Sequence, residues 1–231
     1  MGSCWIASLA LAATLTAAHP GPAASDPGSG APGSEARAVI PVVGAWEVVQ
    51  AEGRRLLKVD GTRWRPGQAG TGLPEKAREL YGGDDAGFLA SVRANPSYPF
   101  AVAREPASFQ DGEITLRFKP LAGREDRAAG ILFDLKSNGD YLALRTNALE
   151  NNLVLWRVVQ GRHSALAEVR NTPIASGHWH ELKLTVRGRL LRGYLDGEEV
   201  LLHTLDQPVA GRAGIWSRAD SVVLFDQFEV H

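Results

Sequence analysis

Alternating apolar and polar residues dominate the last third of the chain. The segment 182–187 alternates leucine or valine with lysine, threonine and arginine, and it stops at Gly188-Arg189. A two-residue turn at that point places Val186 opposite Leu191 and Leu182 opposite Leu195, which gives the strand pair one apolar and one polar face. This alternation is typical of an antiparallel sheet that lies on a core.

A second hairpin is predicted at Asn138-Gly139, because this dipeptide is the strongest short signal for a turn between two strands. A turn there places Phe133 opposite Leu144 and Leu135 opposite Leu142 on a core face. The other face of the pair collects Gly130, Leu132, Asp134 and Lys136 beside Tyr141, Ala143, Arg145 and Asn147.

A third strand pair is predicted to turn at Gly161-Arg162. Its apolar face consists of Val154, Trp156 and Val158 opposite Val169, Ala167 and Ala165, and its other face is mixed. Neighbouring strands with one dry face and one mixed face predict two stacked sheets, one of them curved so that its outer side forms a shallow groove. Residues 74–81 are the one short helix expected, and a bulge at Phe225-Asp226 brings the last apolar residues into phase.

Length and composition allow one well-buried domain, which we expect to span residues 37–231. The 231 residues are 44% hydrophobic and carry a net charge of −1, so there is no general basic field for nucleic acid. We interpret residues 1–18 as a secretory signal peptide and residues 19–36, rich in Pro, Gly, Ala and Ser, as a disordered tether. The protein is therefore expected to be secreted or periplasmic. The single cysteine, Cys4, lies before the apolar block, so the mature chain has no thiol, and no later segment is apolar enough to span a membrane.

Short motifs in the C-terminal half of the chain resemble known domains. They are Trp179-x-x-Leu, Val186-Arg-Gly, Tyr194-Leu-Asp-Gly, Gly211-Arg-Ala-Gly-Ile-Trp and Phe225-Asp-Gln-Phe-Glu-Val. From about residue 109 to 230 the chain resembles concanavalin A-like jelly rolls, and within that group the laminin-G-like domains and the bacterial 3-keto-disaccharide hydrolase family. The resemblance implies an all-β, two-sheet antiparallel jelly-roll sandwich in a protein that handles carbohydrate. The motifs are turns and core positions, and no catalytic motif of the hydrolases matches, so no catalytic residue is assigned.

Polar residues on the non-core face of the second hairpin form the first candidate site. Asp134, Tyr141, Arg145 and Asn147 share that face, and together they offer hydrogen-bonding groups for sugar hydroxyls and an aromatic ring for a pyranose face. The alternative is that Asp134 and Arg145 form an ordinary surface ion pair across the strands.

The connection 147–152 is the most polar one in the strand region. Glu150 and Asn152 offer oxygen atoms suited to Ca²⁺, or donors and acceptors at the lip of the groove. Asn-rich connections also serve turns that need left-handed backbone conformations. His178 and His180 lie on one side of a strand, but without a third ligand they do not define a zinc site, and we predict no bound metal or cofactor.

A third candidate lies between the two closing strands. Trp216 there is able to stack on a sugar while Arg218 and Asp220 direct its hydroxyls, and Asp220 or Asp226 is able to act as an acid or base. The alternative is a turn in which Asp220 caps backbone N–H groups and Trp216 packs inward.

Three functional hypotheses follow from the sequence. The first is an exported, monomeric domain that binds carbohydrate through an open sheet face. The second is an enzyme that acts on glycosides, of the 3-keto-disaccharide type. The third is a structural or interaction domain without a sugar ligand. An enzyme predicts titratable groups in a deep pocket, a binding module predicts exposed aromatic residues on a shallow face, and a structural domain predicts neither.

Overall fold

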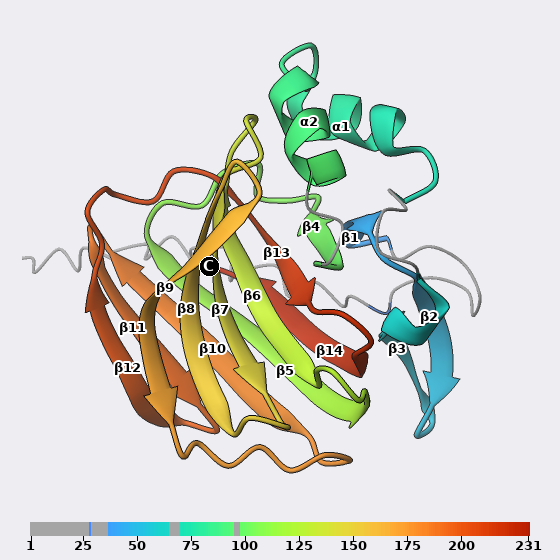
Figure 1. Ribbon diagram of the computed structural model, residues 1–231, viewed down its shortest axis with the longest axis vertical. Helices are drawn as coiled ribbons and strands as arrows, with labels where there is room; N and C mark the ends of the chain where they lie inside the picture. Colours follow the sequence, from blue (N-terminus) through green and yellow to red (C-terminus); the bar gives the residue numbers. More distant parts are fainter. Residues whose placement is uncertain (1–27, 29–36, 65–69, 95–97) are drawn as a thin grey trace, which may run out of the picture.

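The computed structural model describes Gly28 and residues 37–64, 70–94 and 98–231, so the predicted signal peptide and, apart from Gly28, the predicted tether lie outside the described residues. Two seven-stranded antiparallel sheets account for most of the described chain (Figure 1). The two-sheet jelly-roll sandwich predicted from the sequence is confirmed.

The first sheet contains the strand pair with the clearest alternation. In sheet order its strands are β12 (Glu198–Thr204), β11 (Leu190–Leu195), β10 (His180–Arg187), β5 (Gly112–Ala122), β14 (Val222–Val230), β3 (Arg54–Asp60) and β2 (Trp46–Ala51). The register predicted for β10 and β11 is confirmed, with Val186 opposite Leu191 and Leu182 opposite Leu195. The length of the turn and the buried apolar face together fix this register. A shift by one residue would turn the whole apolar face to solvent.

The second sheet contains the two hairpins whose outer faces hold the candidate residues. Its order is β1 (Val39–Val43), β4 (Phe100–Ala103), β13 (Arg212–Ser217), β6 (Ala128–Leu135), β7 (Tyr141–Asn147), β8 (Asn152–Val159) and β9 (Arg162–Arg170).

The register predicted for β6 and β7 is wrong by two residues, because the connection is longer than a two-residue turn. Phe133 lies opposite Leu142, and the loop closes with Lys136 N–H donating to the carbonyl of Asp140. Asp134 has a φ of 53°, and β6 bulges there against β13. The extra residue turns Leu135 to the outer face, whereas Phe133 stays in the core.

The faces of β8 and β9 also differ from those that the alternation of residues predicted. Leu153 and Leu155 of β8 point into the core between the sheets, whereas Val154 and Trp156 lie on the outer face. The side predicted to be mixed is therefore the core side of β8. In β14 a bulge is present as expected, but it falls between Asp226 and Phe228, one residue later than predicted.

Two helices and a short 3-10 helix interrupt the strands. They are η1 (Gly61–Arg63), α1 (Leu73–Tyr81) and α2 (Ala86–Ala94). Helix α1 has Pro74 in its first turn and ends at Gly82, which confirms the predicted helix, but α2 was not expected. Figure 1 shows the two helices side by side above β4 and β1. Within 37–64, 70–94 and 98–231, no helix has the length and apolar composition needed to cross a bilayer.

Two hydrophobic cores result from this arrangement. The main core fills the space between the sheets and includes Phe118, Phe133 and Phe225. The second core lies on the outer face of the second sheet, where Phe88 of α2 packs with Tyr141 and Trp216. The helical segment therefore covers part of that outer face and leaves the part over β7, β8 and β9 open.

Candidate functional site

A cavity of about 590 Å³ lies on the uncovered outer face of β7, β8 and β9. Its apolar surface comes from Val154 and Trp156 of β8 and Ala165 of β9, and Trp156 is partly exposed. The small side chains at positions 154 and 165 leave space beside the indole ring. The polar residues that line the cavity are Arg145, Glu150, Asn152, His163, Glu168, Arg170, Asn171 and Arg218.

Arg145 is a buried cation on the wall of this cavity, with 2% of its surface exposed. Its Nη1 donates to Asn152 Oδ1 at 3.1 Å and its Nη2 to Glu150 Oε2 at 2.9 Å. The guanidinium carbon lies 5.8 Å from the centre of the Trp156 ring. Arg145 Nε is buried and has no hydrogen-bond partner among the described residues. The guanidinium is thus held in place on two sides, with one N–H group unused.

The network continues from Arg145 to the exposed edge of the sheet. Asn152 Nδ2 donates to Glu168 Oε1 at 3.0 Å, and Arg170 Nη2 pairs with Glu168 Oε2 at 3.1 Å. Burial opposes ionisation of Glu150, but the hydrogen bond and charge of Arg145 outweigh it and lower its pKa. Hydrogen bonds from Arg170 and Asn152 lower the pKa of Glu168. Both carboxylates are therefore ionised at neutral pH and act as hydrogen-bond acceptors.

His163 and Arg218 both line the cavity and both contact Tyr98. His163 Nδ1 and the Tyr98 hydroxyl share a hydrogen bond of 2.5 Å, and the His163 ring meets Trp156 edge-on, with 4.8 Å between centroids. Tyr98 in turn stacks on Trp216, with ring centroids 5.4 Å apart, and the Arg218 guanidinium lies 6.0 Å from the Tyr98 ring. Desolvation, followed by the charges of Arg218 and Arg145, lowers the pKa of His163, so its ring is neutral at neutral pH.

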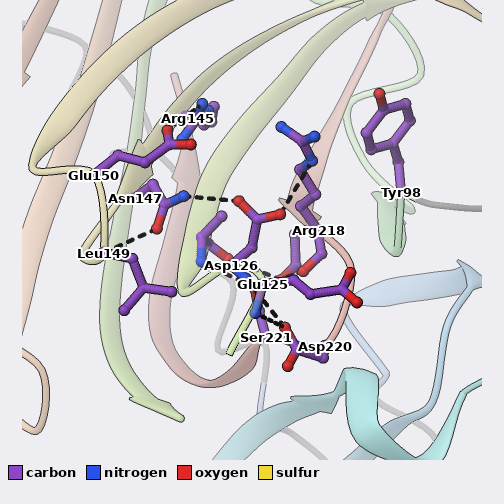
Figure 2. Close-up of polar contacts among 12 residues, drawn as sticks. Tyr98, Glu125, Asp126, Arg145, Asn147, Leu149, Glu150, Arg218, Asp220 and Ser221 are labelled. Atoms are coloured by element: carbon purple, nitrogen blue, oxygen red, sulfur yellow. Dashed lines mark hydrogen bonds and ion pairs between the residues drawn. The ribbon is translucent and has the colours of Figure 1, made fainter. Parts of the chain in front are cut away.

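The loop that carries Arg218 is anchored by Asp126 (Figure 2). Asp126 is buried between two partners, accepting from Asn147 Nδ2 at 2.7 Å and pairing with Arg218 Nε at 3.2 Å. Burial raises the pKa of this carboxyl, although the charges of Arg218 and Arg145 oppose the shift. Asn147 Oδ1 also accepts from the backbone N–H groups of Arg127 and Leu149. Asn147 and Asp126 thus connect the β7–β8 turn to the β13–β14 loop.

Asp220 lies in the same loop and binds backbone groups. Its carboxylate accepts hydrogen bonds from the N–H groups of Arg124, Glu125 and Asp126 at 2.6, 3.0 and 3.1 Å. Trp216 is buried in the second core, with 2% of its surface exposed, and its Nε1 donates to the Tyr141 hydroxyl at 3.3 Å. The structure therefore has the capped turn and inward tryptophan that the sequence left as the alternative.

The nine residues predicted for a ligand site fall into four groups. Four line the cavity: Arg145, Glu150, Asn152 and Arg218. Asn147 and Asp220 support its loops, and Tyr141 and Trp216 are buried in the second core. Asp134 lies near the C-terminal end of β6, where it accepts a hydrogen bond from the Ala210 N–H and pairs with Lys136. The ion pair between Asp134 and Arg145 that was considered above is therefore not formed.

Sequence reasoning did not select Trp156, His163, Glu168 or Arg170 for the site. Trp156 sits in an apolar run that resembles a core strand, and His163 gains its position through Tyr98, which is 65 residues away in the chain. A large aromatic residue flanked across the strands by alanines, Ala143 and Ala165, was the available signal. In the part of the chain that the structure describes, no group of three or more His, Cys, Asp or Glu side chains is arranged to hold a metal ion.

Comparison with solved structures defines the class of fold. The chain is similar to the carbohydrate-binding module CBM66 from Bacillus subtilis, with a TM-score of 0.51, 19% identity, and coverage of 58% of this chain and 83% of that one. It is also similar to a protein of unknown function with a galectin-like fold from Bacillus subtilis, with a TM-score of 0.50, 15% identity, and coverage of 82% and 87%.

These similarities identify the fold as a concanavalin A-like jelly roll. No protein-family model matches the chain, and no curated protein matches it significantly.

Proposed function

We propose that this protein is an exported domain that binds carbohydrate in the cavity over β7, β8 and β9. The observation that carries the proposal is the arrangement of Arg145, which is buried and held against Trp156 by Asn152 and Glu150 at the wall of a cavity of about 590 Å³. A buried cation with fixed partners, an indole ring and small neighbours is what a polar ring-shaped ligand requires.

The chemistry of the lining matches a sugar better than an apolar ligand. A pyranose presents C–H groups on its faces and hydroxyl groups around its edge, so it needs an aromatic or aliphatic surface beside donors and acceptors. Trp156 and Val154 supply the apolar surface, whereas Glu168 and Asn152 supply acceptors and donors. The volume lies in the range of small-molecule sites, which is about 300–1,000 Å³.

Two further observations support the proposal. The first is the likeness in fold to CBM66, whose name describes a carbohydrate-binding module. The second is the apolar block in residues 1–18, which has the features of a secretory signal peptide and agrees with a role outside the cytoplasm.

The test is a glycan-array screen of the mature protein, followed by calorimetry on the best ligand. We expect Trp156→Ala to weaken binding by about tenfold or more, which corresponds to about 1.4 kcal/mol. Trp179→Ala is the matched control, because the Trp179 ring contacts Arg54 and Arg117 of the first sheet. Glu168→Gln, an exposed position, should weaken binding without loss of folding.

Three outcomes would contradict the proposal. Equal glycan binding by wild type and Trp156→Ala would place the site elsewhere. Absence of binding by wild type, together with turnover of a 3-keto-glycoside, would favour the glycoside-processing enzyme instead, and absence of both would favour a structural domain.

A further inference from the structure

Arg218 is a cation of the cavity lining whose terminal nitrogens are left unused by the protein. It directly follows β13 and lines the cavity together with Trp156 and His163. Its Nε pairs with Asp126 Oδ2 at 3.2 Å, whereas Nη1 and Nη2 donate no hydrogen bond to any of the described residues. Figure 2 shows these two nitrogens on the side of the guanidinium that points away from Asp126.

The ion pair with Asp126 sets the direction of this guanidinium. Asp126 has 5% of its surface exposed and also accepts a hydrogen bond from Asn147 Nδ2 at 2.7 Å, so the carboxylate that holds Nε is itself fixed. The Arg218 side chain keeps 30% of its surface exposed. It therefore presents a fork of two N–H donors, which matches the two oxygens of a carboxylate.

The other charged side chains of the lining are already paired with one another. Arg145 Nη2 donates to Glu150 Oε2 at 2.9 Å, and Arg170 Nη2 pairs with Glu168 Oε2 at 3.1 Å. Both glutamates thus have a cation of their own within the lining. The carboxylate that pairs with Arg218 is a buried one behind the cavity and is not part of its lining.

His163 reports the sign of the electrostatic field beside Arg218. Desolvation is the largest cause of its lowered pKa, and the charges of Arg218 and Arg145 add to it. Burial raises the pKa of Tyr98, so its hydroxyl keeps its proton and is able to donate to His163 Nδ1. The neutral ring then carries its N–H at Nε2, which gives the cavity a further donor in a positive field.

We propose that the glycan unit bound in this cavity carries a carboxylate, as a uronic acid does, and that Nη1 and Nη2 of Arg218 bind it. This inference rests on the proposed function and adds the class of sugar to it. The sugar ring lies against Trp156, and its carboxylate receives two parallel N–H donors from the guanidinium. A neutral sugar offers only hydroxyl groups to these donors, so it gains weaker hydrogen bonds.

The experiment compares oligosaccharides of uronic acids with their carboxyl-reduced forms, in which each carboxylate has become a primary alcohol. The two forms share the same rings and linkages and differ only in that group. Calorimetry should show that the mature protein binds the acidic form about tenfold more tightly or better, and that added NaCl reduces this preference. A third set of ligands, neutral sugars that carry sulfate esters, tests whether any anion suffices.

Variants of Arg218 connect the preference to its cause. Arg218→Lys keeps a cation beside Asp126 but loses the fork, so it should retain only part of the preference for the acidic form. Arg218→Gln should bring the ratio of the two affinities close to one. Because Arg218→Gln leaves the buried Asp126 without its cation, the double variant Arg218→Gln/Asp126→Asn removes both charges and should give the same ratio.

The matched control is Arg192→Gln. Arg192 is a partly exposed arginine of β11 in the first sheet, where it pairs with Glu199, so the ratio should stay at the wild-type value. Each measurement follows a ratio between two ligands, which a general loss of stability does not change.

The outcomes separate this inference from the proposed function. Wild-type protein that binds acidic and reduced forms equally well overturns the inference and leaves carbohydrate binding intact. A wild-type preference for acid in the double variant also overturns it, because Arg218 would then not cause the preference. Tighter binding of sulfate esters than of uronic acids overturns the carboxylate. Wild-type protein that binds no saccharide, acidic or neutral, overturns the proposed function and this inference with it.

Discussion

Asp220 gives the most direct test of how the loop behind the site is held. Its carboxylate is partly exposed and accepts hydrogen bonds from three consecutive backbone N–H groups, those of Arg124, Glu125 and Asp126. Asp220→Ala removes the acceptor and leaves these donors to water. Because Asp126 also pairs with Arg218, we expect the substitution to loosen the position of Arg218 as well.

The cost of Asp220→Ala follows from the number and type of these bonds. A hydrogen bond to a charged group contributes about 1.5–3 kcal/mol, and water replaces part of that contribution at a partly exposed position. We therefore expect the free energy of unfolding to fall by about 2–3 kcal/mol. Asp220→Asn retains one oxygen acceptor and should cost about 1 kcal/mol. Asp206→Ala is the matched control, because Asp206 is exposed and pairs only with Arg157 among the described residues.

The pH dependence of this effect has a defined sign. Burial opposes ionisation of Asp220, but the N–H groups of Arg124, Asp126 and Glu125 outweigh it and lower its pKa in the folded state. The stabilisation is therefore complete above the pKa of the unfolded chain, about 4, and is lost as the pH falls through the lower folded-state pKa. Urea unfolding of wild type and Asp220→Ala should differ by a constant amount at neutral pH and converge below about pH 4. A difference of less than about 0.5 kcal/mol at neutral pH would refute this account of the loop.

Three further predictions concern the core, the site and export. Phe133 is fully buried between the sheets, so Phe133→Ala should lower the free energy of unfolding by about 3–5 kcal/mol, whereas Leu202→Ala at an exposed position should change it little; equal midpoints in denaturant would contradict the packing. The lowered pKa of His163 keeps its ring neutral, so glycan affinity should be constant through the neutral range and change only when acid protonates the ring, and a titration step near pH 7 in wild type but not in His163→Ala would argue against this. The exported protein should begin near His19, and an intact mass that retains residues 1–18 would show that no signal peptide is removed.

The sequence predicted the first sheet better than the second, for a physical reason. In β10 one face is buried and the other is in water, so Leu182 and Val186 stand out from their neighbours and the register of β10 and β11 follows. In β6 both faces are dry, because Leu132 packs under the helices while Phe133 packs between the sheets. The alternation of apolar and polar residues then does not show which face of β6 points to the core between the sheets. It also does not reveal the extra residue at Asp134.

The same cause limited the prediction of the site. Arg145, Glu150 and Asn152, which line the cavity, were selected from the sequence because they are polar residues next to core strands. Trp156 was missed because an open face and a buried face look alike in an apolar strand. Tyr98 comes from the segment that follows α2, and only the folded chain brings its hydroxyl to His163.

The position of Arg145 has a consequence for the thermodynamics of binding. Its guanidinium is desolvated and bonded to Asn152 and Glu150 by the fold itself. An exposed arginine would lose rotamer freedom on binding, at a cost of about 0.5–1.5 kcal/mol for each side chain that becomes immobilised. Here folding has ordered that side chain beforehand, so the site is preorganised. If carbohydrate binds in the proposed site, docking beside Arg145 carries no further ordering cost for this side chain.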